Sequence, residues 1–371
     1  MDKKKKILIP LLVALLGIFT FWYAISNYKS LFIFSGDNLE QEYLFILGGI
    51  KRIKAWNFSV YDWSAGFGAD FLIYAFFSSP LSLCLSLSLI HIYIASIMGF
   101  TRNGLVPKFV EPDQYYNLDP FKIEAAIGSK TKAICVVHLY GQIANMPEIM
   151  KIARKYNLKV VEDCAQSHGA SINGKKCGTW GDVGCFSFYP TKNLGGFGDG
   201  GAIITDNKDI AEEVRMMRNY GSKKTYYFEK VGYNSRLDEL QAGLLRVKLK
   251  HLDELTAERR KDALRYLIEI KNPKIKLPEM QFGELGHVFH LFVVYIEDRD
   301  NFMKYCNQKG IELKIHYPQP PHLSTAYEYL GYHVNDFPIT EKMADHIVSL
   351  PLYNGMETEK LEYVINVFNQ Y

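Results

Sequence analysis

The first hundred residues of the chain contain two long stretches without charged side chains. Residues 7–28 carry no charge and follow four consecutive lysines at positions 3–6. A run of this length is what a helix needs to cross the hydrocarbon core of a bilayer. Residues 71–100 form a second uncharged stretch. The pattern therefore predicts one or two transmembrane helices, separated by an extracytoplasmic loop over about residues 30–70.

The lysine cluster predicts the orientation of this segment. Positive side chains favour the cytoplasmic side of a membrane, so the loop after the first span is expected outside. A secretory signal peptide is the alternative for residues 7–28, but no small-residue cleavage pattern follows the long apolar run. A second span would return the rest of the chain to the cytoplasm. We therefore expect a membrane-anchored chain whose catalytic part is cytoplasmic.

Beyond residue 103, short apolar runs alternate with segments of helical periodicity. Strands at close spacing with helices between them indicate an α/β layer around a mostly parallel sheet. Asp119 and Pro120 are the residue types of a helix N-cap and a first helical position. The expected strands are 106–113, 133–139 and 159–162, and the expected helices are 119–127, 147–156 and 208–219.

The C-terminal third combines one long helical pattern with shorter elements. Leucine and valine recur three and four positions apart over residues 237–270, which predicts a single helix with a broad apolar face. The expected organisation is a membrane segment over 1–102, a large domain over 103–250 and a small α+β domain over 251–371. The small domain is expected to contain strands 288–296 and 312–316 and helices 300–309, 340–347 and 358–370.

Composition narrows the class of protein. The chain has 371 residues, of which 48% are hydrophobic, enough for a buried core. Its formal net charge of +3 is nearly balanced, so no nucleic-acid partner is expected. The six cysteines lack CxxC spacing, which favours reduced, cytoplasmic thiols over a disulfide framework. No metal site is expected.

Residues 186–201 are the stretch most suggestive of chemistry. They place Lys192 between an aromatic strand over 185–188 and five glycines, ahead of an apolar strand over 202–205. Glycines let the backbone approach a bound group closely. A lysine beside buried aromatic side chains loses solvation, which frees its lone pair to attack a carbonyl. A solvated lysine in a surface turn is the alternative.

An acid upstream favours the chemical interpretation. Val160 and Val161 lead into Glu162 and Asp163, so a carboxylate stands at the C-terminal end of a predicted strand, where ligands bind in α/β sheets. Pyridoxal phosphate held by a lysine needs an acid against its pyridine nitrogen, because the protonated ring is the electron sink. Asp163 and Lys192 together meet that requirement.

Six sequence blocks follow one another from about residue 103 onward. The blocks are VVHLYGQ (136–142), EDCAQSHGA (162–170), FSFYPTKNLGGFGDGG (186–201), RNYGS (218–222), NSRLDELQAGLLRVKL (234–249) and IHYPQPPH (315–322). Together they resemble the DegT/StrS family of pyridoxal-phosphate sugar aminotransferases. The resemblance implies the type I aminotransferase fold, truncated at its N-terminus, with a smaller α+β C-terminal domain. It also implies a homodimer.

The same resemblance implies roles for individual residues. Lys192 holds the cofactor covalently and moves the proton in transamination, and Asp163 keeps the pyridine nitrogen protonated. Gln166 is placed near the phenolic oxygen of the ring, and Ser187 binds the phosphate. Asn234 reaches the cofactor phosphate of the neighbouring subunit. An ordinary strand hydroxyl remains the alternative for Ser187, and a turn residue for Asn234.

The substrate candidates are Tyr189, His316 and Tyr317. Prolines after Tyr317 stiffen this segment, so its side chains can hydrogen-bond sugar hydroxyls or a diphosphate. The block at 315–322 resembles members that aminate a nucleotide-linked 3-keto-6-deoxyhexose. Glutamate as the amino donor is implied by the resemblance alone.

The N-terminal segment resembles a different kind of protein. Residues 36–80, with Asp37 and Gln41, are similar to the first extracytoplasmic loop of YfhO-like polytopic bacterial membrane proteins. Residues 87–92 read like the translated end of a transposon used in sequencing libraries, which predicts a chimeric junction. A natural fusion is the alternative.

The junction has a consequence for activity. The N-terminal part of the family, with a helix N-terminus that binds the cofactor phosphate, finds no counterpart in this resemblance. We therefore expect the chain as written to bind its cofactor weakly and to turn over little. The alternative function is a membrane-protein fragment fused to an inactive or sensory cofactor-binding domain.

Overall fold

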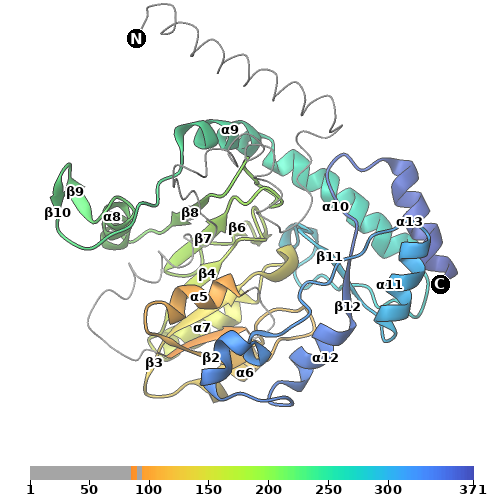
Figure 1. The fold of residues 1–371 in the computed structure, drawn as a ribbon, viewed down its shortest axis with the longest axis horizontal. Helices are drawn as coiled ribbons and strands as arrows, with labels where there is room; N and C mark the ends of the chain where they lie inside the picture. The colour runs from red at the N-terminus through yellow and green to blue at the C-terminus, as the bar shows by residue number, and fades with distance from the viewer. Residues whose placement is uncertain (1–84, 90–93) are drawn as a thin grey trace, which may run out of the picture. The chain divides into compact units, whose positions relative to one another are not determined.

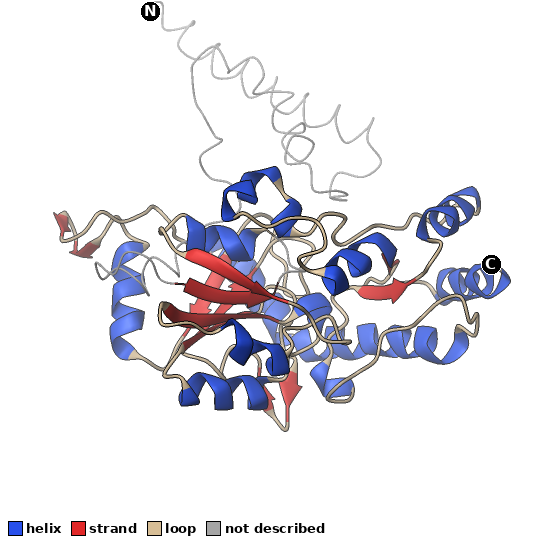
Figure 2. Ribbon diagram, turned by 90° about the horizontal axis from the view of Figure 1, so that it is seen from below, coloured by secondary structure: helices blue, strands red, loops and turns tan. Residues whose placement is uncertain are grey.

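The computed structural model describes residues 85–89, by their backbone, and residues 94–371. Six strands form the central sheet in the order β2-β1-β3-β4-β7-β8 (Figures 1 and 2). Five of them run parallel, and β8 pairs antiparallel with β7. The strands are β1 (Leu85–Leu89), β2 (Val106–Val110), β3 (Thr131–Val137), β4 (Lys159–Asp163), β7 (Val183–Ser187) and β8 (Gly201–Ile204).

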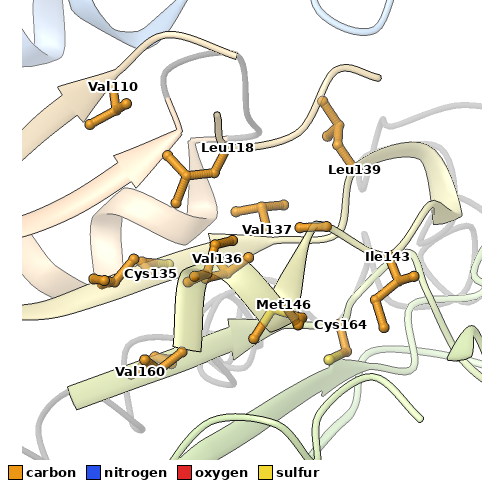
Figure 3. Packing of buried hydrophobic residues seen from close by; sticks show 14 of the residues in the cluster. Val110, Leu118, Cys135, Val136, Val137, Leu139, Ile143, Met146, Val160 and Cys164 are labelled. Atoms are coloured by element: carbon orange, nitrogen blue, oxygen red, sulfur yellow. The ribbon is translucent and has the colours of Figure 1, made fainter. Parts of the chain in front are cut away.

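The helices of this layer explain why its strands can be so apolar. Strands of a parallel sheet are covered on both faces, and β3 accordingly buries Ile134 to Val137 without interruption. Figure 3 shows Leu118, Val136 and Met146 among the side chains packed there. The predicted α/β architecture is therefore confirmed. The helices are α6 (Pro120–Ala126), α7 (Met146–Lys155) and α8 (Lys208–Met217).

Local capping chemistry sets the helix starts that the sequence indicated. The side chain of Asp119 accepts a hydrogen bond from the backbone N–H of Phe121 at 3.0 Å, and Pro120 is the first residue of α6. Asn145 caps α7 in the same way, through the N–H of Glu148 at 3.4 Å. The predicted N-cap of α6 is thus confirmed.

The segment before residue 103 corrects one prediction. β1 lies between β2 and β3, and α5 (Ala95–Thr101) is a short helix whose Ile97 and Phe100 are fully buried in the core. The uncharged run is apolar here because it belongs to a protein interior. A second membrane span over residues 71–100 is therefore wrong for the described part of that run.

No helix among the described residues is long and apolar enough to cross a membrane. The first predicted span, over residues 7–28, and the loop over residues 30–70 lie outside the described residues.

The long helix predicted over residues 237–270 is two helices. α9 (Glu239–Lys250) and α10 (Leu252–Glu269) meet at His251, whose φ of −106° and ψ of 5° leave the helical region. The leucine periodicity continues through this break, so periodicity alone gave no sign of it. Figure 1 shows α10 continuing from α9 toward α11 and α13.

The C-terminal elements surround a second cluster of buried side chains. Phe292, Phe302 and Phe368 lie in it without exposure, and the rings of Phe302 and Phe368 are 5.2 Å apart. The predicted strand over 312–316 is wrong, because Lys314 forms only an isolated bridge to Ser349. The elements are β11 (Phe292–Tyr295), antiparallel to β12 (Ile347–Leu350), with α11 (Arg299–Gln308), α12 (Pro338–His346) and α13 (Thr358–Gln370).

Candidate active site

Asp163 is the last residue of β4, at the carboxyl edge of the parallel sheet. Its Oδ1 accepts a hydrogen bond from the backbone N–H of Ala165 at 3.0 Å. Its Oδ2 accepts a hydrogen bond from the hydroxyl of Ser96 in α5 at 2.6 Å. The carboxyl group is half-buried. It is therefore held in place and still open to a ligand at the strand end.

The neighbouring strand brings the lysine loop to the same edge. Asp163 of β4 lies opposite Cys185 of β7, and β7 ends two residues later at Ser187. The Oγ of Ser187 accepts a hydrogen bond from the N–H of Tyr189 at 3.3 Å. The carbonyl of Phe188 accepts a hydrogen bond from the N–H of Gly196, which folds the loop back on itself.

Lys192 lies in the turn at the centre of this loop. Its backbone N–H donates to the carbonyl of Tyr189 at 2.9 Å, and the residue is half-buried. A side chain at Gly195 would put its Cβ 2.2 Å from the carbonyl oxygen of Pro190. The loop can therefore close tightly around Lys192 only with glycine at that position.

The positive charge of Lys192 contributes to lowering the pKa of two buried histidines. Burial lowers the pKa of His168 to about 3, and the charge of Lys192 adds to the shift. Burial also lowers the pKa of His290 well below its ordinary value, with further contributions from Lys192 and Arg259. Both imidazoles are therefore neutral near pH 7. His290 donates from Nδ1 to the Oδ1 of Asn193 at 3.0 Å, next to the lysine.

Gln166 connects the sheet edge with the segment that carries His316 and Tyr317. Its Oε1 accepts from the backbone N–H of Tyr140 at 2.7 Å, and its Nε2 donates to the hydroxyl of Tyr317 at 3.1 Å. The hydroxyl of Tyr140 donates in turn to the carbonyl of His316. The ring of His316 bonds through Nδ1 to the Oγ of Ser349 at 2.8 Å. These contacts unite residues far apart in the sequence.

Asn234 occupies a different setting from the other predicted site residues. It is exposed on this chain and pairs through its backbone with Asn219, in the segment that follows α8. This pairing joins it to Asn219 rather than to the edge that carries Asp163 and Lys192. Tyr189, by contrast, lies half-buried within the lysine loop.

The carboxylate next to Asp163 has another function. Glu162 is fully buried, and burial alone would raise its pKa. Hydrogen bonds from His138 and from the backbone N–H groups of Gly181 and Gly178 outweigh that effect and lower the pKa. Trp180 donates a further N–H to Glu162 at 2.7 Å. Glu162 is therefore a buried structural anion.

His138, Glu162 and Cys164 lie close enough to share a metal ion, but hydrogen bonds already occupy the two polar residues. Nε2 of His138 donates to Oε2 of Glu162 at 3.0 Å, and Nδ1 accepts from the N–H of Ala144 at 3.1 Å. The imidazole is thus the neutral tautomer with its proton on Nε2, and the pair ties β3 to β4.

The sequence did not identify Ser96, Tyr140 or His290 as part of this site. Ser96 lies 67 positions before its partner Asp163, and His290 lies 97 positions after Asn193. Ser96 also falls within the run interpreted as a membrane span. The run carries no charged residue before Arg102, so the local sequence gave no signal that would have found Ser96.

The residues at the two strand ends form a set that fits pyridoxal phosphate. A carboxylate (Asp163) suits a protonated ring nitrogen, an amide (Gln166) a phenolic oxygen, a hydroxyl (Ser187) a phosphate, and an amine (Lys192) an aldehyde carbon. All four residues follow or end β4 and β7, which are adjacent in the sheet. Strand ends of this kind are where α/β sheets bind ligands.

Comparison with known proteins identifies the family of this chain. A model of the DegT/DnrJ/EryC1/StrS aminotransferase family matches residues 90–369. The match begins earlier than the expected residue 103, so it also includes α5. The relative "dTDP-3-amino-3,6-dideoxy-alpha-D-galactopyranose transaminase" of Aneurinibacillus thermoaerophilus is 51% identical over 280 residues, which are 75% of this chain and 76% of that protein.

Solved structures share the fold. DesV from S. venezuelae superposes with a TM-score of 0.78 at 35% identity, and the alignment covers 90% of this chain and 96% of DesV. The ntda protein from Bacillus subtilis, solved with bound cofactor PMP, gives a TM-score of 0.74 at 26% identity. That alignment covers 95% of this chain and 81% of ntda.

Proposed function

The chain belongs to the DegT/DnrJ/EryC1/StrS aminotransferase family, and we propose that it aminates a nucleotide-linked 3-keto-6-deoxyhexose with glutamate as the donor. It is an aminotransferase that uses pyridoxal phosphate. The observation that carries the substrate proposal is that Asp163, Gln166 and Lys192 end or follow adjacent strands, and that Gln166 contacts Tyr317 of the candidate substrate segment. The relative at 51% identity is named for a 3-amino-3,6-dideoxy sugar.

The residues of the edge divide the chemistry among them. Bound pyridoxal phosphate supplies an electron sink for the carbon that loses a proton. Lys192 would hold the cofactor through its Nζ, and the same amine would accept and return that proton. Asp163 would keep the proton on the ring nitrogen. Tyr140 and Tyr317 fix Gln166, whose amide N–H would be directed to the phenolic oxygen, and Ser187 would bind the phosphate.

We assign the sugar side of the site to Tyr189, His316 and Tyr317. The contact from Gln166 to the hydroxyl of Tyr317 links this segment to the cofactor edge. Ser349 and Tyr140 fix the ring and the carbonyl of His316, respectively. Side chains held in this way present hydrogen-bonding groups in one geometry, which favours recognition of a particular pattern of hydroxyls.

A homodimer is proposed because α9 turns apolar side chains to solvent. Leu240 is 76% exposed and Val247 is 62% exposed. Apolar side chains gathered on a surface mark interfaces between proteins. In a dimer that covers α9, the exposed Asn234 just before it would reach the cofactor phosphate of the neighbouring subunit.

Replacing Val247 by Asp tests the dimer. A carboxylate in an apolar interface leaves an unpaired buried charge, so we expect a shift toward monomer in analytical ultracentrifugation. Ile268→Asp on α10, where Ile268 is 64% exposed, is the matched control and should leave the association state unchanged. A V247D variant that remains dimeric would contradict the assignment of the interface to α9.

The proposed reaction is tested with the purified full chain, pyridoxal phosphate, glutamate and a dTDP-linked 3-keto-6-deoxyhexose. Mass spectrometry should detect the amino sugar and 2-oxoglutarate in equal amounts, and Lys192→Ala should abolish both. The 4-keto isomer and a UDP-linked keto sugar are offered separately. Amination of the 4-keto isomer but not of the 3-keto sugar would sink the 3-keto-6-deoxyhexose proposal and leave sugar transamination intact.

A sensory domain that binds the cofactor without turnover is the alternative. It predicts that glutamate leaves the absorbance of the bound cofactor unchanged, whereas a transaminase changes it in a single turnover. The weak cofactor binding expected above is tested by titrating the cofactor-free chain with pyridoxal phosphate. A dissociation constant for pyridoxal phosphate in the low micromolar range or below would refute that weakness.

The membrane span over residues 7–28, the YfhO-like loop and the junction over residues 87–92 stay predictions. Sequencing single long DNA molecules across the junction tests the chimera. An intact reading frame in many independent molecules would contradict the chimera hypothesis. Detergent-dependent extraction of the full chain would then test the membrane span.

A further inference from the structure

A serine from a distant helix holds the carboxylate of Asp163. The hydroxyl of Ser96, in the first turn of α5, donates to Oδ2 of Asp163 across 2.6 Å. Ser96 is 4% exposed, so water does not compete freely for this hydroxyl. A hydrogen bond from a buried neutral donor to a carboxylate is among the stronger kinds in proteins. The contact is therefore a built feature of the site.

The two oxygens of Asp163 are each fixed by one donor. The backbone N–H of Ala165 holds Oδ1 at 3.0 Å, and Ser96 holds Oδ2. One donor on each oxygen fixes the torsion about the Cβ–Cγ bond. A carboxylate has about four acceptor positions, so both oxygens keep capacity for a further partner. With the Ala165 contact alone, the carboxylate of Asp163 could still rotate about the Cβ–Cγ bond.

The donor is itself held firmly. Ile97 and Phe100 anchor α5 in the hydrophobic core, each with at most 1% exposure. The side chain of Asn103 closes the C-terminal end of the helix through the carbonyl of Gly99 at 2.7 Å. Serine has one side-chain torsion, so its hydroxyl cannot move far once α5 is docked.

We propose that Ser96 is a positioning residue that orients the carboxylate of Asp163 toward the ring nitrogen of pyridoxal phosphate. The inference rests on the proposed role of Asp163 in that contact. Ser96 acts through Asp163. Loss of its hydroxyl lets the carboxylate rotate away from the line to the ring nitrogen, which weakens cofactor binding and alters the protonation of the bound ring.

A pair of isosteric variants isolates the hydroxyl. Ser96→Thr keeps it and Ser96→Val replaces it by a methyl group, so both add the same volume to the core. In the full chain, we expect S96V to bind pyridoxal phosphate on the order of tenfold more weakly than S96T, as measured by fluorescence titration of the cofactor-free protein. The pH dependence of the bound cofactor's visible absorbance should shift in S96V and return in S96T.

Thr101→Val is the matched control within α5. The hydroxyl of Thr101 contacts the carbonyls of Ile97 and Met98 and the hydroxyl of Tyr327, and these contacts do not involve Asp163. T101V should bind the cofactor like the unmodified chain. Equal dissociation constants and equal absorbance profiles for S96V and S96T would overturn the proposal.

Combining these variants with Asp163→Asn separates the proposed role of Ser96 from the proposed role of Asp163. If Ser96 acts through Asp163, S96V should weaken binding much less in the D163N background than alone. A full additive loss would show that Ser96 acts elsewhere and would overturn the proposal. If D163N by itself left cofactor binding and absorbance unchanged, the role of Asp163 would fail, whatever the result for Ser96.

Discussion

The strand β4 ends in two adjacent carboxylates, one of them buried within the protein and the other half-buried at the candidate site. Side chains alternate along a strand, so Glu162 and Asp163 face opposite sides of the sheet. Glu162 is buried and receives N–H groups from His138, Gly178, Trp180 and Gly181. Asp163 is half-buried and is held by Ser96 and Ala165.

The histidines on the two sides repeat the contrast. His138 donates to Glu162 and stabilises its charge. His168, in the loop after β4, meets the positive charge of Lys192, and burial together with that charge lowers its pKa to about 3. One side satisfies its charge internally and stabilises the fold. On the other side, Asp163 is half-buried and Lys192 is half-buried, and both are proposed to meet groups of a ligand.

The largest expected effect is on the Asp163 side. Asp163→Asn should lower turnover on the order of a thousandfold, because the amide cannot hold a proton on the ring nitrogen. The free energy of unfolding of the cofactor-free chain should change by less than about 1 kcal/mol, since Asn retains an oxygen acceptor. Steady-state kinetics and urea unfolding measure the two. A D163N variant that loses stability as well would erase the contrast with Glu162.

Glu162→Gln should show the reverse. The new NH₂ group would face N–H donors at whichever oxygen it replaces, so the free energy of unfolding should fall by about 3 kcal/mol. Glu124→Gln is the control, because its ion pair with Lys155 is exposed and should change stability by less than about 1 kcal/mol. Denaturant melts of the cofactor-free chain decide. Unchanged stability in E162Q would mean that the buried pair contributes little.

The histidine contrast predicts a pH dependence. An unfolded histidine takes up a proton near pH 6.5, whereas folded His168 resists protonation until about pH 3. The unfolded state therefore binds more protons between these values, and the fold loses stability as the pH falls. The loss is at most about 1.4 kcal/mol per pH unit for one histidine.

His168→Phe isolates this contribution. The ring of His168 packs 5.4 Å from Phe186, so an aromatic replacement suits the site. Urea melts at pH 5 and pH 7 should show a smaller difference in the variant than in the unmodified chain. An identical difference would mean that His168 is not protonated selectively on unfolding.

The smallest expected effect concerns the segment that reaches the site from the C-terminal region. Tyr317→Phe removes the acceptor for Nε2 of Gln166, which should reduce kcat/KM about three- to tenfold through poorer orientation. Tyr363→Phe removes an exposed hydroxyl that donates to the carbonyl of Lys309 and is the matched control. Equal kinetics for Y317F and Y363F would limit the site to the ends of β4 and β7.

Much of this site was predictable from local sequence. Asp163 is marked by the β-branched strand that precedes it, Lys192 by the glycine loop, and α6 by the cap of Asp119. The family match and the α/β sheet confirm the family and the fold class, and the cap of α6 is confirmed, whereas the roles of Asp163 and Lys192 stay predictions. Local signals can indicate such features because strand ends, tight turns and helix caps are set by residues close in sequence.

The tertiary structure decided the rest. Alternation along β4 places Glu162 and Asp163 on opposite sides, but only contacts with His138, Gly178 and Ser96 determine which acid is internal. The uncharged run before residue 103 is equally compatible with a membrane helix and with a buried segment of a globular protein, because the lipid bilayer and the protein interior favour the same apolar side chains. Docking of α5 against the core resolves it for the described residues and brings Ser96 to Asp163.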